Sequence, residues 1–309
     1  SQFRQYFMSL LQNRLEDFNM NNITGHTGLT ALLGSPVAHS ISPLMHNESF
    51  RLLGLDYVYL CFDVNEETLP AAVAGLKTCG IRGFNLTMPN KNKIVELLDE
   101  LSPEAQLIGA VNTVLNDNGK LIGYNTDGYG FMQSVRDAGH DITGKNITVM
   151  GVGGASMAIC AQSALDGAAS VHIFARRTSR YWNRTQKFAE NLSAKTGCQV
   201  CLFDNDDHTA LRDSIAQSYL LINATSVGMV PDIDDTIIKD TSLFHPGLVV
   251  ADVVYEPQET RLLREAKAAG CQTFNGMYML LHQGAKAFQI WTGQEMPVSV
   301  IKEKYFSVK

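Results

Sequence analysis

The sequence lacks any apolar run of the about 18–20 residues that a membrane-spanning helix requires, so we expect no membrane segment. It also lacks an excess of positive charge, because 25 lysine and arginine residues stand against 31 aspartate and glutamate residues, a net charge of −6. Proteins that bind nucleic acid usually carry a net basic face, so no nucleic-acid partner is expected. The sequence has no internal repeat, and 45% of its residues are hydrophobic, which is typical of a globular protein.

Cysteine is too sparse for a disulfide framework or a cysteine-based metal cluster. Among the six cysteines only Cys198 and Cys201 form a Cys-x-x-Cys pair, and no second pair accompanies it. This pair lies in a strand-like stretch, so we interpret it as two reduced structural thiols and not as a redox or metal site. No other group of residues has metal-ligand spacing, so we expect no metal. Reduced thiols indicate the cytoplasm as the compartment.

The length of 309 residues suggests about two domains. Apolar runs alternate with helical patterns almost throughout, which is the signature of an α/β protein built from βαβ units. Asn118-Gly119 predicts a tight hairpin turn between the last two strands of the first half. The strands expected in this half are Leu29–Leu33, Tyr57–Asp63, Gly83–Thr87, Val111–Leu115 and Lys120–Tyr124.

The second half shows a more regular pattern of short buried strands and helices. Its expected strands are Ile147–Met150, Val171–Phe174, Gln199–Phe203, Tyr219–Asn223 and Leu248–Asp252. This pattern predicts a Rossmann-type, doubly wound parallel sheet. A last helical stretch, Met277–Trp291, would return to the first domain. We therefore expect residues 1–126 with 277–309 as one α/β domain and 127–276 as a cofactor domain, with the site between them.

A glycine-rich loop follows the strand Ile147–Met150. It reads Gly-Val-Gly-Gly-Ala-Ser over residues 151–156 and opens a helical pattern. Glycines at this point allow backbone N–H groups to approach a pyrophosphate, although serine replaces the third glycine of the usual fingerprint. A glycine-rich turn without a ligand is the alternative. We expect a dinucleotide site formed by Gly151, Gly153, Gly154, Ala155 and Ser156.

The end of the next strand indicates which dinucleotide binds. An NAD site usually has an acidic residue about 20 residues beyond the glycine loop, to bind the ribose hydroxyl. Residues 167–189 contain no acid, and Arg176, Arg177 and Thr178 come directly after the strand. A 2′-phosphate would favour such cations and hydroxyls, so we predict NADP, with NAD as the alternative. Arg184 and Lys187, further on, are interpreted as part of a solvated helix face.

Polar residues gather where the first-half strands end. Ser40 and Ser42 are two hydroxyls near a helix start, suited to hold a carboxylate, although Ser42 before Pro43 also resembles a helix N-cap. Pro89 can begin a helix, which would place Lys91 in its first turn, where a solvated lysine is the alternative to a proton-transfer group. Asp127 can serve in catalysis or merely begin a helix.

Seven motifs occur in the order found in the shikimate dehydrogenases, and the chain resembles that family over about residues 25–295. The first four are Ser-Pro-x-x-His-Ser-x-Ser-Pro, Asn-x-Thr-x-Pro-x-Lys, Gly-Ala-Val-Asn-Thr and Gly-x-Asn-Thr-Asp-Gly. The glycine loop, residues 223–228 and Gln283-Gly-Ala continue the pattern. The amino-acid sequence around Lys91 and over residues 285–293 is most similar to that of the branch that includes quinate/shikimate dehydrogenases.

This resemblance implies a reversible hydride transfer between shikimate and 3-dehydroshikimate with a nicotinamide cofactor, in the pathway to chorismate and aromatic amino acids. It assigns Lys91 and Asp127 to the catalytic pair, and Ser40 and Ser42 to the substrate carboxylate. The residues that it assigns to the rest of the substrate are Thr87, Asn112, Tyr255 and Gln283. The further residues that it assigns to the cofactor are Asn223, Thr225, Val253 and Gly276.

The sequence departs from the family pattern at the strand that precedes the arginines. Ala175 stands where asparagine is frequent, and Thr178 or Ser179 stands where the quinate-using branch often has an acid. This departure puts the use of NAD in doubt more than it does the reaction. The alternatives to an NADP-dependent shikimate dehydrogenase are a quinate/shikimate dehydrogenase that also uses NAD and a non-catalytic sensor of shikimate or the cofactor. A homodimer is also open, since the amphipathic segment Ser1–Phe18 can serve the domain core or a dimer contact.

Overall fold

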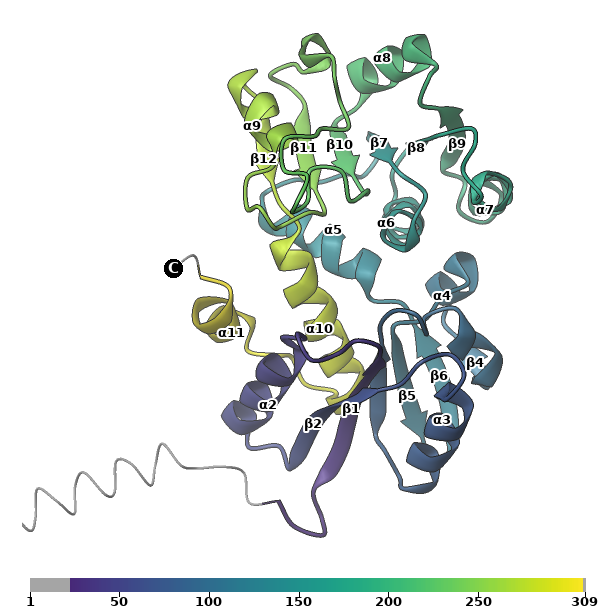
Figure 1. Cartoon of the computed structure of the whole chain (residues 1–309), viewed down its shortest axis with the longest axis vertical. Coiled ribbons are helices and arrows are strands. Elements are labelled where there is room, and N and C mark those ends of the chain that lie inside the picture. Colours follow the sequence, from purple (N-terminus) through teal and green to yellow (C-terminus); the bar gives the residue numbers. More distant parts are fainter. Residues whose placement is uncertain (1–22, 308–309) are drawn as a thin grey trace, which may run out of the picture.

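The computed structural model describes residues 23–307, which form two six-stranded sheets joined by helices. Figure 1 shows one sheet formed by the first part of the chain and the other formed by the later part, with the helices α5 and α10 running between them. This is the expected α/β architecture. The segment Ser1–Phe18, considered above for a dimer contact, lies outside the described residues.

The first sheet has the strand order β2-β1-β3-β5-β6-β4. Strands β1, β2 and β3 are parallel, whereas β5 is antiparallel to both β3 and β6. The turn between β5 and β6 is the predicted hairpin, and Asn118 there has a positive φ of 52°. The strands are β1 (Gly28–Gly34), β2 (Tyr57–Asp63), β3 (Gly83–Leu86), β4 (Glu100–Leu101), β5 (Thr113–Asp117) and β6 (Lys120–Tyr124).

Three α-helices and one 3₁₀ helix connect these strands. They are α2 (Ser42–Leu53), α3 (Leu69–Thr78), α4 (Pro103–Ile108) and the 3₁₀ helix η1 (Lys93–Leu97). The expected helix from Pro89 is wrong, because residues 88–92 form turns and η1 begins only at Lys93. The Lys91 carbonyl accepts a hydrogen bond from the Val111 backbone N–H at 2.8 Å. This bond connects the turn to the segment before β5, so the carbonyl takes no part in a helix.

The second sheet has the strand order β12-β11-β10-β7-β8-β9, and every neighbouring pair is parallel. In chain order this is the 3-2-1-4-5-6 arrangement of a dinucleotide-binding fold, read from the β9 edge, as predicted. The strands are β7 (Asn146–Met150), β8 (Ser170–Ala175), β9 (Gln199–Asp204), β10 (Leu220–Asn223), β11 (Val249–Asp252) and β12 (Gln272–Phe274).

Helices cover this sheet and connect it to the first one. They are α5 (Asp127–Asp137), α6 (Gly154–Leu165), α7 (Trp182–Thr196), α8 (His208–Gln217), α9 (Arg261–Ala268), α10 (Met277–Thr292) and α11 (Val298–Tyr305), with a 3₁₀ turn η2 (Thr241–Leu243). No helix within residues 23–307 is long and apolar enough to span a bilayer.

The end of α10 is anchored in the first sheet, so the chain returns to the first half as expected. The buried indole N–H of Trp291 donates to the Val114 carbonyl at 3.0 Å, and the Arg82 side chain donates to the Trp291 carbonyl at 2.8 Å. Gly83 leaves room for the indole, since a Cβ there would lie 2.2 Å from its nitrogen. The predicted domain boundaries at 126 and 276 stay predictions.

Candidate active site

A cavity of about 700 Å³ is lined by residues from both halves of the chain. Its walls come from the ends of β1 and β3, the start of α2, the segment after β11, and the helices α10 and α11. The predicted site residues that line it are Ser40, Ser42, Thr87, Lys91, Asn112, Asp127, Val253, Tyr255, Gly276 and Gln283. Folding therefore brings the predicted catalytic and substrate-binding residues to one place.

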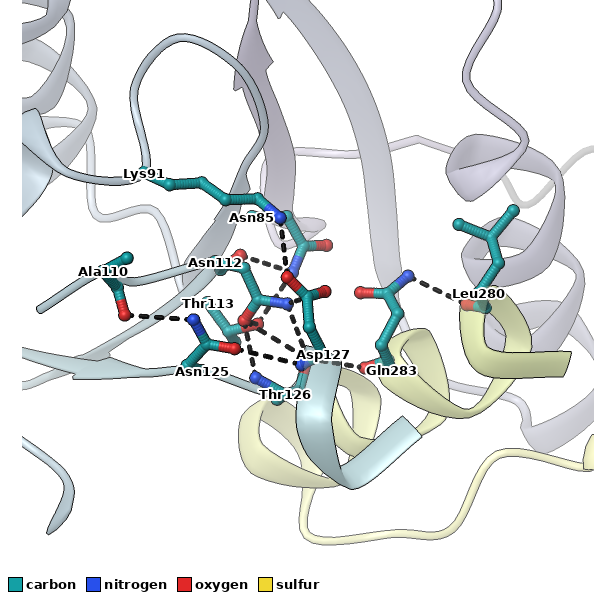
Figure 2. Close-up of polar contacts among 10 residues, drawn as sticks. All are labelled: Asn85, Lys91, Ala110, Asn112, Thr113, Asn125, Thr126, Asp127, Leu280 and Gln283. Carbon is teal, nitrogen blue, oxygen red and sulfur yellow. Dashed lines mark hydrogen bonds and ion pairs between the residues drawn. The ribbon is translucent and has the colours of Figure 1, made fainter. Parts of the chain in front are cut away.

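Lys91 and Asp127 form an ion pair in this cavity. The Lys91 Nζ lies 2.7 Å from the Asp127 Oδ2, and both side chains are largely buried, with 31% and 15% of their surfaces exposed. Lys91 extends from the turn after β3, whereas Asp127 is the first residue of α5 (Figure 2). Proton exchange between the two groups needs no movement, because they are already at hydrogen-bond distance.

Asp127 is held in place by its neighbours. The Asn112 side-chain amide donates to the Asp127 Oδ1 at 2.9 Å, so both carboxylate oxygens have a partner. Asn125 accepts a hydrogen bond from the Asp127 backbone N–H at 3.2 Å. Thr126 donates its hydroxyl to the Gln283 carbonyl at 3.0 Å, which joins α5 to α10 beside the pair (Figure 2). The carboxylate is thus fixed before any substrate arrives.

Asn85 is a buried cavity residue to which sequence reasoning gave no role. Its side-chain amide donates to the Asn112 carbonyl at 3.1 Å and to the Thr113 hydroxyl at 3.0 Å, and it accepts from the Tyr59 hydroxyl at 2.8 Å. These bonds place Asn112, which in turn holds Asp127. The residue belongs to the Asn-x-Thr motif quoted above, but nothing in that motif shows which side chains it meets.

The two serines have different local roles from those considered on the sequence. The Ser40 hydroxyl accepts a hydrogen bond from the Ser42 backbone N–H at 3.2 Å, so Ser40 and not Ser42 stabilises the start of α2. The N-cap interpretation of Ser42 is wrong, because Ile41 is already helical with φ −81° and ψ −12°. Ser42 is the first helical residue, and its side chain lines the cavity next to that of Ser40.

The other predicted substrate residues surround this centre. Thr87 directly follows β3, and Gln283 lies on α10 with its side-chain amide donating to the Leu280 carbonyl at 2.9 Å. Tyr255 follows β11 and is 41% exposed at the side of the second sheet. The last described residues of the chain, Tyr305, Phe306 and Ser307, also line the cavity, which no sequence pattern indicated.

The glycine loop joins β7 to α6 as predicted. Gly151 has a φ of 112°, and a Cβ there would lie 2.7 Å from the Thr225 methyl group, so this position requires glycine. Gly153 and Gly154 face open space at the N-terminus of α6. The Ser156 hydroxyl donates to the Gly151 carbonyl at 2.6 Å, which shows what serine does in place of the third glycine.

The basic residues after β8 are exposed. Arg176, Arg177 and Thr178 leave the strand end at Ala175, and within residues 23–307 neither arginine forms an ion pair with an acid. The Arg177 guanidinium carbon lies 4.8 Å from the centre of the Trp182 ring. Arg184 and Lys187 are also exposed, on α7. The strand end therefore presents positive charge that is not engaged in an ion pair within the described residues.

Asn223 and Asp252 form a buried polar cluster at the ends of β10 and β11. Asn223 accepts from the Thr225 backbone N–H at 3.1 Å and from its hydroxyl at 2.6 Å, and it donates to the Asp252 carboxylate at 3.0 Å. Asp252 also accepts from the Thr260 hydroxyl at 2.7 Å. Burial raises the pKa of Asp252 to about 6. Sequence reasoning missed Asp252, although its place at a predicted strand end was a signal.

Val253 and Gly276 lie next to each other where the second sheet meets the cavity. A Cβ at Gly276 would lie 2.1 Å from the Val253 carbonyl oxygen, so only glycine allows this approach. Asn223 is the last residue of β10, and Val253 and the glycine loop directly follow β11 and β7. All three lie at the carboxyl edge of the parallel sheet, where such sheets bind ligands. The predicted cofactor residues thus border one edge, and that edge adjoins the Lys91–Asp127 pair.

Comparison with known proteins decides the family. Residues 32–114 match the shikimate dehydrogenase substrate binding domain, and residues 276–304 match the shikimate 5′-dehydrogenase C-terminal domain. A shikimate dehydrogenase (NADP(+)) of Listeria innocua is 52% identical over 284 residues, which is 92% of this chain and 97% of that protein. This chain belongs to the shikimate dehydrogenase family.

Solved structures of this family have the same fold. Shikimate 5-dehydrogenase from Listeria monocytogenes, in complex with shikimate and NAD, is 51% identical with a TM-score of 0.89, covering 91% of this chain and 97% of that one. The Thermus thermophilus enzyme, in complex with NADP(H) and shikimate, is 36% identical with a TM-score of 0.74, covering 90% and 98%. The resemblance to the shikimate dehydrogenases is thus confirmed, whereas the roles of individual residues stay predictions.

The residues at the second sheet fit the NADP of a shikimate dehydrogenase. The loop at Gly153 and Gly154 leaves space where a pyrophosphate would approach the N-terminus of α6. The unpaired arginines after β8 supply the positive charge that a 2′-phosphate needs. Within the described part of the chain no group of three or more histidine, cysteine, aspartate or glutamate side chains could hold a metal ion.

Proposed function

We propose that this protein is an NADP-dependent shikimate dehydrogenase, which oxidises shikimate to 3-dehydroshikimate reversibly. The observation that carries the proposal is the Lys91–Asp127 pair, 2.7 Å apart, in a cavity that adjoins the carboxyl edge of a dinucleotide-binding sheet. When bound, the cofactor accepts a hydride from the carbinol carbon of the substrate, and it returns this hydride in the reverse direction.

Lys91 and Asp127 handle the proton of this reaction. Loss of a hydride from the carbinol carbon turns the hydroxyl into a carbonyl, so the hydroxyl proton must pass to a base. Lys91 and Asp127 share a hydrogen bond and can take up this proton together. In the reverse direction the same groups supply the proton, and the Lys91 ammonium stabilises the negative charge that develops on the oxygen.

Ser40 and Ser42 orient the substrate by its carboxylate. Their side chains line the cavity at the start of α2, on the part of the wall that the first half of the chain supplies. We assign Thr87, Asn112 and Gln283 to the ring hydroxyls and Tyr255 to the substrate, since all four line the cavity. A ring held at several points presents one hydroxyl to the catalytic pair, which replaces a diffusional encounter by a fixed geometry.

Arg176, Arg177 and Thr178 make NADP the expected cofactor. Exposed guanidinium groups without acidic partners attract the dianionic 2′-phosphate, whereas NAD has only a neutral hydroxyl at that place. NAD remains the alternative cofactor, and quinate the alternative substrate. Quinate carries an additional hydroxyl, and the cavity is lined by several polar side chains that could accept it.

Steady-state kinetics with shikimate or quinate, each with NADP⁺ or NAD⁺, tests this proposal by the absorbance at 340 nm. We expect the highest kcat/KM for shikimate with NADP⁺. A clear preference for NAD⁺ would overturn the cofactor assignment and leave the reaction in place. Binding of shikimate or NADP⁺ without turnover would instead identify the protein as a sensor on the same fold.

Compartment and assembly complete the proposal. Within residues 23–307 all six cysteines are free thiols, which supports a reducing compartment, and we place the protein in the cytoplasm. A homodimer is the assembly that we propose. Light scattering on the purified protein at several concentrations decides between a homodimer and a monomer.

A further inference from the structure

Arg176, Arg177, Arg180 and Arg184 lie within and just after the loop between β8 and α7, and the buried ring of Trp182 contacts Arg177. We propose that Trp182 is a positioning residue, which keeps the Arg177 guanidinium ready for the 2′-phosphate of NADP and so strengthens the preference for NADP over NAD. This inference rests on the proposed function. It assigns a role in cofactor selection to a side chain that no motif of the sequence includes.

The contact between Arg177 and Trp182 is a cation–π pair. The guanidinium carbon lies 4.8 Å from the centre of the indole ring, within the distance at which this attraction operates. Arg177 is exposed, whereas Trp182 is only 8% exposed. The exposed arginine therefore lies over a ring that is itself buried in the protein.

Trp182 is fixed because it begins a helix at the end of a folded loop. It is the first residue of α7, and its backbone N–H donates to the Ser179 carbonyl at 3.0 Å. The Ser179 backbone N–H in turn donates to the Arg176 carbonyl at 2.9 Å, so the loop returns from the strand end to the indole. The ring is thus connected by two hydrogen bonds to the residue directly after β8.

The contact with the ring leaves the N–H donors of Arg177 available. A guanidinium that lies on a ring uses its face, while its N–H donors point outward in the plane and can still form two parallel bonds to a phosphate. An exposed arginine without such support samples many rotamers and loses that freedom when it binds. Trp182 removes part of this cost in advance, which favours a ligand that has the phosphate.

A neighbouring pair in the same loop offers a matched control. Arg180 lies 4.7 Å from the centre of the Tyr181 ring, but it also donates to the Tyr181 hydroxyl at 2.6 Å. One of its donors is therefore already used. Tyr181→Leu removes an aromatic ring from this loop without touching Arg177, so it shows what the loss of any ring does.

The kinetic test compares NADP⁺ and NAD⁺ as cofactors of shikimate oxidation. Trp182→Leu keeps an apolar side chain at the buried position and removes the ring, and we expect it to raise the KM for NADP⁺ by about 2- to 5-fold, with kcat unchanged. The KM for NAD⁺ should stay constant. Trp182→Phe retains a weaker ring and should give an intermediate value, and Tyr181→Leu should behave like the parent protein.

Fluorescence tests the same contact without relying on the leucine variant. The chain has two tryptophans, and Trp291 is 1% exposed in the core of the first half, bound to Val114. A ligand that engages Arg177 should therefore change the emission of Trp182 alone. We expect a saturable change with adenosine 2′,5′-bisphosphate, a much smaller one with adenosine 5′-monophosphate, and none with either ligand in Trp182→Phe.

The outcomes separate this inference from the proposed function. An equal loss of NADP⁺ and NAD⁺ affinity in Trp182→Leu, or no change with either, would overturn the role of Trp182 while the activity of the parent protein stands. The same holds if the bisphosphate leaves the emission unchanged or changes it equally in Trp182→Phe. A parent protein that does not oxidise shikimate with NADP⁺ would overturn the proposed function itself.

Discussion

Lys91 and Asp127 are 36 positions apart in the chain and meet only because their elements end at the same cavity. The sequence spacing alone favours neither of two roles for Asp127, a catalytic group or simply the first residue of a helix. In the structure Asp127 begins α5 and also pairs with Lys91, so a place at a helix start does not exclude catalysis, and the catalytic role stays a prediction. The first residue of a helix can thus also point its side chain into a cavity, as Asp127 does.

Replacing Lys91 by alanine tests the catalytic pair. Because the ammonium group carries the proton and stabilises the alkoxide, we expect Lys91→Ala to lower kcat about 10²- to 10⁴-fold, with a smaller change in KM. Steady-state rates with shikimate and NADP⁺ measure this.

Lys93 offers the matched control for this substitution. It lies two positions further on and pairs with Glu96 outside the cavity, so Lys93→Ala should keep the parent rate. An unchanged kcat in Lys91→Ala would remove Lys91 from the mechanism.

Hydrogen bonds between residues distant in sequence explain why single side chains were hard to predict. Ser40 accepts from the Ser42 backbone N–H because α2 begins one residue earlier than the serine-proline pattern indicates. Asn85 contacts Asn112, which lies 27 residues away on another element. The types of residue in the site were readable from motifs, but their partners depend on how the strands pair.

At the level of elements, strands with a long apolar or alternating pattern were predictable from the sequence, and strands of two or three residues were not. The strands with at least four apolar or alternating residues were found on the sequence, within one or two residues of their observed bounds. The strands β4 and β12 have two and three residues, too few for a period-2 pattern to show. Near Lys91 the local helical signal was overridden by the bond between its carbonyl and Val111.

The loop between β7 and α6 gives a prediction at this scale. Gly151 has a positive φ and no space for a Cβ, so Gly151→Ala should lower the free energy of unfolding by about 1–3 kcal/mol. Gly153 has ordinary backbone angles and open space around it, so Gly153→Ala should leave stability unchanged within about 0.5 kcal/mol.

The same pair of variants separates folding from cofactor binding. The methyl group of Gly153→Ala would stand where the pyrophosphate approaches the backbone, so this variant should raise the KM for NADP⁺. Urea unfolding measures the first effect and steady-state kinetics the second. Equal destabilisation by both substitutions would contradict the distinction between the two glycines.

On the scale of the whole molecule, a buried histidine connects stability to pH. His46 is fully buried beneath Tyr59, Phe288 and Trp291, with its ring 4.5 Å from that of Tyr59, and neither ring nitrogen has a hydrogen-bond partner. Burial lowers the pKa of His46 from 6.5 to about 3. It is a core residue that packs among aromatic rings.

The sign of the pH effect follows from this lowered pKa. Below about pH 6.5 the unfolded chain gains a proton on His46 that the folded protein does not accept, so stability falls as the pH falls through the window from 6.5 to about 3. Between pH 7 and pH 5 this amounts to about 2 kcal/mol. Urea unfolding at the two values measures the total change in the parent protein, and the His46 part is the difference between this change and that of a variant without the ring.

His46→Leu removes the titrating ring and should lose less stability between pH 7 and pH 5 than the parent protein. Asp252 titrates with the opposite sign, because its raised pKa makes stability fall as the pH rises, but it is present in both proteins and cancels in the comparison. The exposed His208 gives a control in His208→Gln, which should behave like the parent. An identical pH dependence in His46→Leu would contradict the assignment.

The sequence by itself determined the family, the sheet of the second half, the glycine loop and the basic strand end that favours NADP. These depend on local patterns, namely alternation of apolar residues, glycine where backbone must bend, and the absence of acids over one segment. Only the tertiary structure decided which side chains meet. Thr126 bonds to Gln283 across 157 positions, and the end of α11 lines the cavity, because packing of the two sheets through α5 and α10 brings those segments together.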